Sequence, residues 1–225
     1  MEKVATGVFW VGGGELSDPA DCCVYALDLG ETVLIDCGCG PGWPQIRANL
    51  QAAGLDPGRI HTLVLTHAHV DHIGAASSVV AESGCRLIAH ALDAEAIELG
   101  DPQKTASEWY GVRLSALALD EKIKGDGRAL DFPWARLQLV HTPGHTPGSL
   151  AAWLDTQEGR VLFGQDIHGP FSDHFGSDLE AWRDSMDVLL DLEADLLCEG
   201  HFGIIRGKDK VRTFIETHLQ RNAPG

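Results

Sequence analysis

Short apolar runs, separated by turn residues and by stretches with helical spacing, organise the first half of the chain. Runs of strand length occur at residues 4–11, 22–29, 31–35, 63–65 and 86–89. Apolar positions at helical spacing predict one helix over about 43–53, ending at Gly54, and another over about 75–83. The tight connection Leu29-Gly30-Glu31 predicts a hairpin, and the alternation after it predicts a β-α-β unit.

The second half repeats the strand pattern after an irregular segment. Residues 91–127 contain helical or irregular pieces without a strand pattern, interrupted by Asp101-Pro102 and Gly111, so we interpret this segment as an insertion. A second sheet is implied after it, with strands at 136–140, 150–154, 161–163 and 196–198 and helices at about 179–190 and 208–219.

Composition and charge limit the classes of function. The chain has 225 residues, of which 44% are hydrophobic, and we expect one domain over residues 1–225. Lys and Arg total 17 against 33 Asp and Glu, and the net charge of −16 would repel nucleic acid and anionic membranes alike. No apolar run has the length of a membrane helix, and the N-terminal residues lack the apolar core of a signal peptide. We therefore expect a cytoplasmic protein that acts on a small molecule.

The cysteine pattern does not indicate a disulfide framework. None of the six cysteines forms a C-x-x-C pair, and most of them lie in apolar, strand-like runs. We expect reduced, buried thiols rather than disulfides or a structural zinc site.

A dense group of metal-binding residue types follows the predicted strand at 63–65. The stretch Thr66-His67-Ala68-His69-Val70-Asp71-His72-Ile73-Gly74 carries three imidazoles and one carboxylate within six residues. Open α/β sheets place their ligands at the carboxyl ends of strands. Side chains alternate in an extended loop, so His67 and His69 can converge on one ion while Asp71 and His72 turn toward a second. The spacing therefore suggests two metals.

Later predicted strands end in residues of the same kind. The loop 141–149 is rich in Pro and Gly, and from it we choose His145 over His141 as the imidazole that points inward. The next strand leads to Asp166, and the last predicted strand leads to His201. Each loop that should line the site thus supplies one candidate ligand.

Asp36 also ends a predicted buried strand near these loops. We expect its carboxylate to hold loop amides through hydrogen bonds rather than to bind metal.

The ordered set H-x-H-x-D-H, G-H-T-P-G-S, Asp and His is similar to the motifs of the metallo-β-lactamase-fold hydrolase superfamily. The resemblance covers nearly the whole chain and implies an α/β fold, a four-layer αββα sandwich with a short helical insertion. The halves at about 1–95 and 125–225 would each supply a sheet and outer helices, with the metals at the shared edge of the sheets. Transferred residue by residue, the resemblance implies a first metal bound by His67, His69 and His145, a second bound by Asp71, His72 and His201, and a bridge from Asp166.

The implied chemistry is hydrolysis without a Ser or Cys nucleophile. Imidazole and carboxylate ligands favour two Zn²⁺ ions, with Fe or Mn as alternatives in one or both sites. Two ions at about 3.5–4 Å can share a water and lower its pKa toward about 7, which supplies a metal-bridging hydroxide. Asp71 can orient that hydroxide. We therefore expect a dinuclear metal-dependent hydrolase acting on an ester, thioester or lactone carbonyl of a small molecule.

Within the superfamily, the chain resembles glyoxalase II-like and lactonase-like members more than true β-lactamases. True β-lactamases of this fold commonly carry Cys or Ser at the position of Asp166. Glyoxalase II proper has a helical C-terminal domain for glutathione, whereas few residues follow His201 here. Acyl-homoserine lactonases typically place a Tyr where this chain has Gly169. RNase Z needs a basic extension, which this acidic chain does not offer.

Two other classes of function stay open. Persulfide dioxygenases of this fold bind a single iron through two histidines and the bridging Asp, and ligand identity alone does not exclude iron. A non-catalytic metal-binding module would be indicated by lost ligands, but all seven ligand positions of the motif set are filled.

Aromatic and histidine side chains close to the metal-bearing positions are candidates for the substrate pocket, namely His168, Phe171, His174, Phe202 and Trp109. We interpret segment 91–127 as a lid or pocket wall, in which the Tyr110 phenol can donate a hydrogen bond to the substrate's carbonyl oxygen. Alternatively, Trp109 and Tyr110 only anchor the insertion to the domain, or to the second subunit of a homo-oligomer.

Overall fold

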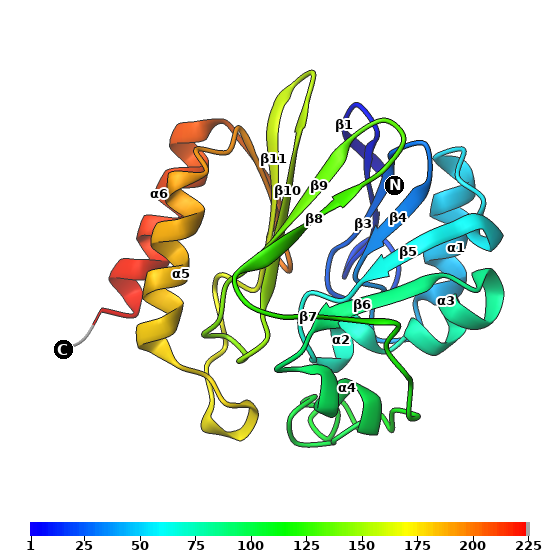
Figure 1. Cartoon of the computed structure of the whole chain (residues 1–225), viewed down its shortest axis with the longest axis horizontal. Coiled ribbons are helices and arrows are strands. Elements are labelled where there is room, and N and C mark those ends of the chain that lie inside the picture. The colour runs from blue at the N-terminus through cyan, green and yellow to red at the C-terminus, as the bar shows by residue number, and fades with distance from the viewer. Residues whose placement is uncertain (224–225) are drawn as a thin grey trace.

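Two β-sheets pack face to face, and helices cover the outer face of each sheet (Figure 1). The computed structural model describes residues 1–223. The first sheet has seven strands in the order of the chain: β1 (Glu2–Ala5), β2 (Val8–Gly12), β3 (Val24–Asp28), β4 (Thr32–Ile35), β5 (Ile60–Val64), β6 (Arg86–His90) and β7 (Glu121–Ile123). The second sheet has six strands in the order β13-β12-β11-β10-β9-β8: β8 (Gly127–Asp131), β9 (Arg136–His141), β10 (Leu150–Thr156), β11 (Gly159–Gln165), β12 (Leu196–Glu199) and β13 (Gly203–Arg206).

The helices complete the predicted four-layer αββα sandwich, which is confirmed. On the first sheet lie α1 (Trp43–Ala52) and α3 (Ala76–Ser83), with the 3₁₀ turn η1 (Pro57–Arg59), while the single turn α2 (Val70–Ile73) and α4 (Ala94–Leu99) lie at the lower edge of this sheet in Figure 1. On the second sheet lie α5 (Leu179–Asp191) and α6 (Lys208–Arg221), with η2 (Asp173–Phe175) before α5. Asp178 caps α5 by accepting hydrogen bonds from the backbone N–H groups of Glu180 and Ala181.

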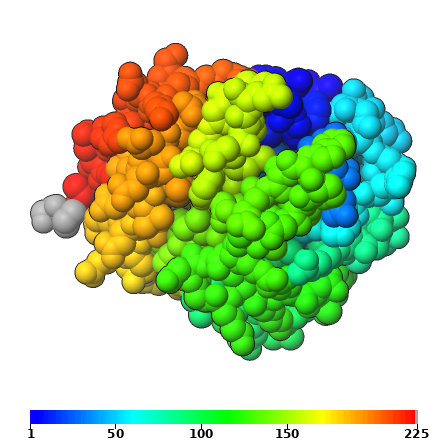
Figure 2. All heavy atoms as spheres, turned by 45° about the horizontal axis from the view of Figure 1, so that its top comes forward, coloured from blue at the N-terminus to red at the C-terminus, as the bar shows by residue number. Residues whose placement is uncertain are grey.

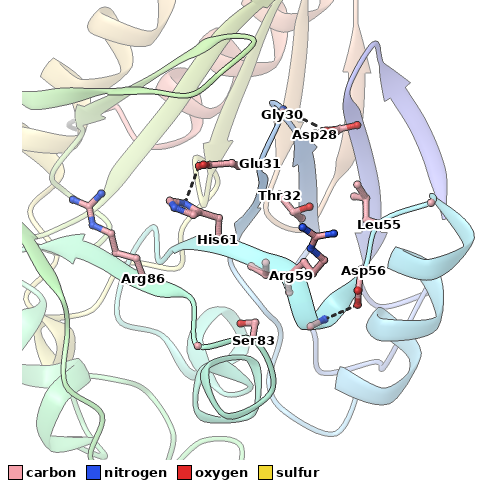
Figure 3. A pocket seen from close by; sticks show the side chains of 14 residues that line it. Asp28, Gly30, Glu31, Thr32, Leu55, Asp56, Arg59, His61, Ser83 and Arg86 are labelled. Carbon is pink, nitrogen blue, oxygen red and sulfur yellow. Dashed lines mark hydrogen bonds and ion pairs between the residues drawn. The ribbon is translucent and has the colours of Figure 1, made fainter.

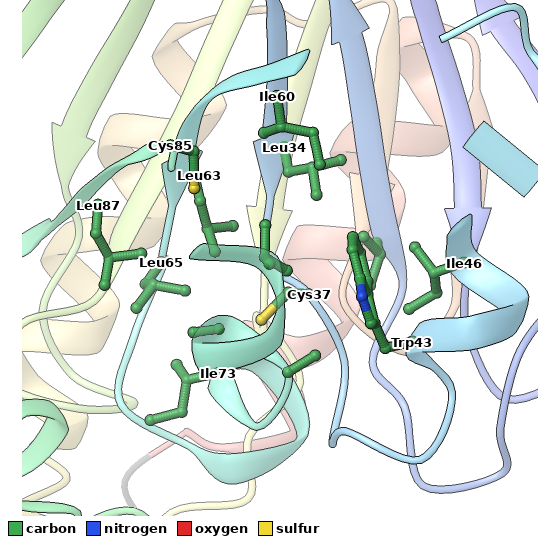
Figure 4. Close-up of a cluster of buried hydrophobic side chains, with 14 of the residues drawn as sticks. Leu34, Cys37, Trp43, Ile46, Ile60, Leu63, Leu65, Ile73, Cys85 and Leu87 are labelled. Carbon is green, nitrogen blue, oxygen red and sulfur yellow. The ribbon is translucent and has the colours of Figure 1, made fainter. Parts of the chain in front are cut away.

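Three apolar clusters lie between the four layers. The cluster between the sheets includes Tyr25 and Phe163, whose ring centroids are 5.5 Å apart. A second cluster lies under α1 and α3, and Figure 4 shows Trp43 and Ile46 of α1 in the same cluster as Leu34 of β4. The third lies under α5 and α6 and contains Trp182. Burial on both faces explains why the central strands read as continuous apolar runs in the sequence.

Parallel strands bring the functional loops to one edge of both sheets. β4, β5, β6 and β7 pair in parallel, and β11 is parallel to β12. Backbone hydrogen bonds join the two sheets at this edge, since the Leu150 N–H donates to the Thr66 carbonyl at 2.8 Å and the Cys23 N–H to the Gly200 carbonyl at 2.6 Å. The loops after β5, β11 and β12 therefore converge.

The strand predicted over residues 4–11 was wrong in its extent, because the chain turns back on itself there. β1 and β2 form an antiparallel hairpin around Gly7, which has φ +73°. A side chain at Gly7 would also place its Cβ 2.8 Å from the carbonyl oxygen of Asp28. The conformation and the contact both favour glycine, which a continuous strand would not require.

The segment predicted to lack a strand, 91–127, ends in one. β7 pairs in parallel with β6, so the first sheet extends to Ile123 rather than to about residue 95. β8 and β13 were also missing from the prediction. These strands have three to five residues and lie at or near sheet edges, so they are too short for alternation to identify. No helix within residues 1–223 is long and apolar enough to cross a membrane.

Candidate metal centre

The histidine-rich stretch after β5 changes conformation halfway. His69 is extended, with φ −67° and ψ 143°, and it is the N-cap residue of α2. Asp71 and His72 therefore project from a helical turn and not from the extended loop that was predicted. The Val70 N–H of this turn donates to the Thr105 carbonyl at 2.8 Å, so segment 91–127 supports the turn directly.

One group of donor atoms comes from His67, His69, His145 and Asp166, and these atoms all lie within 4.8 Å of one another. His69 Nδ1 is 2.9 Å from His145 Nε2, which is 3.4 Å from Asp166 Oδ2. His67 Nε2 is 3.9 Å from the same oxygen. Ligands at 2.0–2.1 Å around a tetrahedral ion are separated by about 3.4 Å, so the group has dimensions that suit one metal ion.

A second group comes from Asp71, His72 and His201. Asp71 Oδ2 is 3.3 Å from His201 Nε2 and 3.6 Å from His72 Nε2. Asp166 reaches this group as well, with Oδ1 3.3 Å from His72 Nε2 and Oδ2 3.4 Å from His201 Nε2. The fold thus brings all seven predicted ligands together in two groups with Asp166 between them.

The chemistry of these donors fits metal ions. His67 Nε2, His72 Nε2 and Asp166 Oδ1 are buried without a hydrogen-bond partner, which is costly unless an ion takes their lone pairs. Burial holds the pKa of His67 well below its ordinary value and that of His69 at about 3. Burial alone would raise the pKa of Asp166, but nearby His72 and His201 hold it well below its ordinary value. Neutral imidazoles and an ionised carboxylate are the forms that bind metal.

Asp36 is a buried hydrogen-bond acceptor beneath the second group, as the sequence predicted. It accepts from the Thr66 N–H at 2.8 Å, the Thr66 hydroxyl at 2.7 Å, His72 Nδ1 at 2.6 Å and the Gln165 amide. Because His72 Nδ1 donates to Asp36, its Nε2 keeps the lone pair that faces the donors of the second group.

Two further buried carboxylates have similar roles and escaped the sequence analysis. Asp93 accepts from the Ala68 N–H at 3.0 Å, the Thr146 hydroxyl at 2.7 Å and the Gly148 N–H at 2.7 Å. Glu199 accepts from two N–H groups of the His201 loop and from His168. Glu199 is the last residue of the buried strand β12, much as Asp36 directly follows β4, so the same reasoning could have found it, whereas Asp93 carries no such signal.

A third set of donors, Cys22, Asp36 and His72, also lies within 4.8 Å. Asp36 is already occupied by hydrogen bonds, and burial raises the pKa of the Cys22 thiol well above its ordinary value. The set therefore offers a metal ion fewer available donors than the two groups around Asp166. All six cysteines are free and buried, which confirms the prediction of reduced thiols.

His141 lies apart from both metal groups. Its ring stacks on His90 with centroids 3.9 Å apart, and its Nε2 is 2.9 Å from the Pro147 carbonyl. The choice of His145 over His141 agrees with this placement.

Aromatic rings and histidines surround the two groups. Phe175 packs on His69 with centroids 4.3 Å apart, and Trp109 packs on Phe175 at 5.5 Å. On the other side, His168 lies 5.2 Å from both the His201 and the Phe202 rings.

Segment 91–127 forms a broad part of the surface, drawn mainly in green in Figure 2.

The remaining predicted pocket residues differ in placement. Phe171 packs against Trp182 at 5.2 Å and against His145 at 6.3 Å, so it supports a ligand from behind. His174 accepts a hydrogen bond from Gln103 at 2.7 Å, which joins segment 91–127 to the loop before α5. Burial, and then the charge of Asp71, raise the pKa of Tyr110.

A separate groove of about 810 Å³ lies at the amino ends of β4, β5 and β6, away from the metal groups (Figure 3). In it His61 Nδ1 lies 3.1 Å from Glu31 Oε2. Arg86 at its rim pairs with Glu121. These charges are paired with each other, and the groove contributes nothing to the metal-binding groups.

Comparison with known sequences shows what the chain is similar to. A sequence profile described as the Metallo-beta-lactamase superfamily matches residues 18–201. A Beta-lactamase-like protein 2 homolog of Drosophila melanogaster is 29% identical over 204 residues, covering 88% of this chain and 64% of that protein. The Probable metallo-hydrolase YqgX of Bacillus subtilis is 32% identical over 164 residues, covering 70% of this chain and 74% of the relative. The chain spans less than two thirds of the Drosophila protein and of a Caenorhabditis elegans homolog, 64% and 61% respectively.

Solved structures share the fold at lower sequence identity. The metallo-beta-lactamase GOB-18 from Elizabethkingia meningoseptica superposes with a TM-score of 0.78 at 22% identity, covering 98% of this chain and 88% of that one. A beta-lactamase from Chitinophaga pinensis has a TM-score of 0.80 at 18% identity, covering 97% and 89%. At this identity the likeness concerns the architecture alone.

Proposed function

Because the chain belongs to the metallo-β-lactamase superfamily, we propose that it is a dinuclear metal-dependent hydrolase that cleaves an ester, thioester or lactone carbonyl of a small molecule. The position of Asp166 is the observation that supports two metal ions. Its Oδ2 lies 3.4 Å from His145 Nε2 of one group and 3.4 Å from His201 Nε2 of the other. A carboxylate within reach of both groups suits a bridging ligand. We propose zinc because both groups consist of imidazoles and carboxylates.

Ions held in both groups would lower the pKa of a shared water and polarise the substrate carbonyl. The side chains of the protein position the reactants. Asp71 Oδ2 lies close to both His72 and His201, which leaves its other oxygen to accept a hydrogen bond from the attacking water and orient it. The low pKa values of His69 and His145, both about 3, keep these rings neutral, so they serve as ligands and not as acids.

The surroundings of the centre favour a substrate with an apolar part and without high negative charge. Trp109 packs on Phe175 and Phe202 on His168 beside the two groups, and these two rings are 54% and 56% exposed. Exposed aromatic rings beside a reactive centre suit contact with an apolar acyl or leaving group. The net charge of −16 disfavours polyanions, nucleic acid included.

We assign segment 91–127 to one wall of the substrate site. The Trp109–Phe175 contact and the hydrogen bond from Gln103 to His174 hold it against the loop before α5. The raised pKa of Tyr110, caused first by burial and then by Asp71, keeps the phenol protonated at neutral pH. A protonated phenol at this place can donate a hydrogen bond to an oxygen on which negative charge develops.

Elemental analysis of the protein purified without added metal, combined with a substrate panel, tests the proposal. We expect about two zinc ions per chain. We also expect turnover of activated thioesters, small esters or lactones, with little for cephalosporins or RNA. One iron per chain, together with oxygen uptake on glutathione persulfide that exceeds ester hydrolysis, would overturn the hydrolase proposal in favour of a dioxygenase.

A further inference from the structure

His168 lies on the loop after β11, two positions beyond Asp166, at the outer side of the second metal group. One of its ring nitrogens lies within 4.8 Å of donor atoms of Asp166 and His201. His168 belongs to no such group with Asp71 or His72. The structure therefore contains an outer set of donors, Asp166, His168 and His201, beside the inner set of Asp71, His72 and His201.

Glu199 determines which nitrogen of His168 is available. Its carboxylate is fully buried, and Oε2 accepts from the His201 N–H at 2.7 Å and from the Phe202 N–H at 2.9 Å. Oε1 lies 3.0 Å from His168 Nδ1. An ionised carboxylate only accepts hydrogen bonds, so His168 Nδ1 carries the proton and its Nε2 keeps a lone pair.

The Glu199–His168 pair repeats the arrangement of Asp36 and His72 on the inner side. In both pairs a fully buried carboxylate accepts from Nδ1 of a histidine that belongs to a donor set. Metal-binding histidines are usually held in this way, with the second nitrogen donating to a carboxylate. A residue that merely lines a pocket needs no such partner.

The two sets share His201 and Asp166, so they describe alternative positions for one ion and not sites for two. The two donors that belong only to the inner set are closed to solvent, with His72 0% and Asp71 6% exposed. The donor that belongs only to the outer set, His168, is 22% exposed, and His201, which both sets share, is 32% exposed. An ion that arrives from solvent therefore meets His168 and His201 before it reaches His72.

We propose that Asp166, His168 and His201 form an outer position for the second metal ion, from which the ion passes to the inner position by exchanging His168 for Asp71 and His72. The proposal rests on the dinuclear function proposed above. Two imidazoles and one carboxylate suit a divalent transition ion such as Zn²⁺ and not Mg²⁺, which prefers oxygen ligands.

Asp71→Ala separates the two positions. The Asp71 carboxylate pairs with the imidazoles of His72 and His201 and belongs to the inner set alone, so its removal takes a ligand from the inner position and leaves the three outer donors in place. We expect this variant to bind two Zn²⁺ per chain, the second about 10-fold or more weaker than in the wild type. Asp71→Ala combined with His168→Ala should bind only one. Equilibrium dialysis against Zn²⁺ with elemental analysis measures the stoichiometry, and Co²⁺ absorption spectra report the change of ligands.

His174→Ala in the Asp71→Ala background is the matched control. His174 is another exposed histidine near the centre, but it belongs to neither donor set, so this double variant should retain two ions. Circular dichroism of each metal-free variant verifies folding. Should the His168 double variant fail to fold, His168→Ala alone serves instead: stopped-flow Zn²⁺ uptake should show slower binding of the second ion, with the final stoichiometry unchanged.

The outcomes distinguish this inference from the proposed function. If the wild-type protein binds fewer than two ions, both the proposed dinuclear function and the outer position are refuted. If the wild type binds two ions, the outer position is refuted by an Asp71→Ala variant that binds one, or by a His168 double variant that still binds two. Unchanged uptake kinetics in His168→Ala would refute it as well.

Discussion

Asp36→Asn tests whether Asp36, without binding metal itself, controls the affinity for metal through its hydrogen bond from His72. In the native protein Asp36 Oδ1 accepts from the Thr66 N–H, and Oδ2 accepts from the Thr66 hydroxyl, His72 Nδ1 and the Gln165 amide. Asparagine replaces one of these oxygens with an NH₂ group. If the asparagine oxygen still accepts from the Thr66 N–H, the NH₂ group faces the Thr66 hydroxyl, His72 Nδ1 and the Gln165 amide, which are all donors in the native protein.

Two of these three donors can adapt. The Thr66 hydroxyl can rotate to accept, and the Gln165 amide can turn its Oε1, which has no partner at present, toward the new NH₂ group. The third donor, His72, can accept only if its proton moves from Nδ1 to Nε2. The ring then loses the lone pair that faces Asp166 and that would bind the proposed second metal ion.

We expect the affinity for the second ion to fall about 10- to 100-fold, which corresponds to about 1.4–2.7 kcal/mol. The metal-free protein should lose only about 1–3 kcal/mol in its free energy of unfolding. Competition with a chelator measures the affinity, and urea unfolding of the metal-free protein measures the stability.

Asp93→Asn is the matched control. Asp93 is equally buried and accepts three hydrogen bonds, but none from a metal-binding imidazole. This control should lower stability without selectively weakening the second ion. The reasoning fails if Asp36→Asn binds the second ion as tightly as the wild type, or if Asp93→Asn weakens that ion by the same factor.

Three further predictions concern activity and pH. Asp166→Ala should lower activity by several orders of magnitude and release metal, whereas His141→Ala should retain both, and equal effects in assays of turnover and metal content would contradict the ligand assignment. Tyr110→Phe should lower kcat about 100-fold with stability nearly unchanged if the phenol donates to the developing oxyanion, and an unaltered kcat would leave Tyr110 with a packing role. In the metal-free protein, burial holds the pKa of His69 and His145 at about 3 against an ordinary value of 6.5. The unfolded chain then binds more protons than the native state below pH 6.5, so the free energy of unfolding should decrease as pH falls from about 6.5 toward 3, and thermal melts across this range in the presence of a chelator should show a falling Tm.

The sequence predicted the donor residues that the fold brings together because each lies in a loop or turn that follows a strand. His67, Asp166 and His201 follow β5, β11 and β12 within a few residues, so an apolar run and the residue type after it were sufficient evidence. The same local signal identified Asp36 as a hydrogen-bonding carboxylate. The main strands and helices were predicted for a similar reason, since their periodicity depends only on neighbouring residues.

Tertiary structure alone decided the features that depend on residues far apart in the chain. The three-residue β7 exists because β6 offers it a parallel partner, and Gly7 turns the chain because the Asp28 carbonyl lies against it. Asp93 became a support of the metal loops only through contacts such as its bond to Thr146, 53 positions away. The availability of His168 likewise depends on Glu199, 31 positions away and on another strand. No local pattern encodes such pairs, because burial and hydrogen-bond geometry arise only when the two sheets pack together.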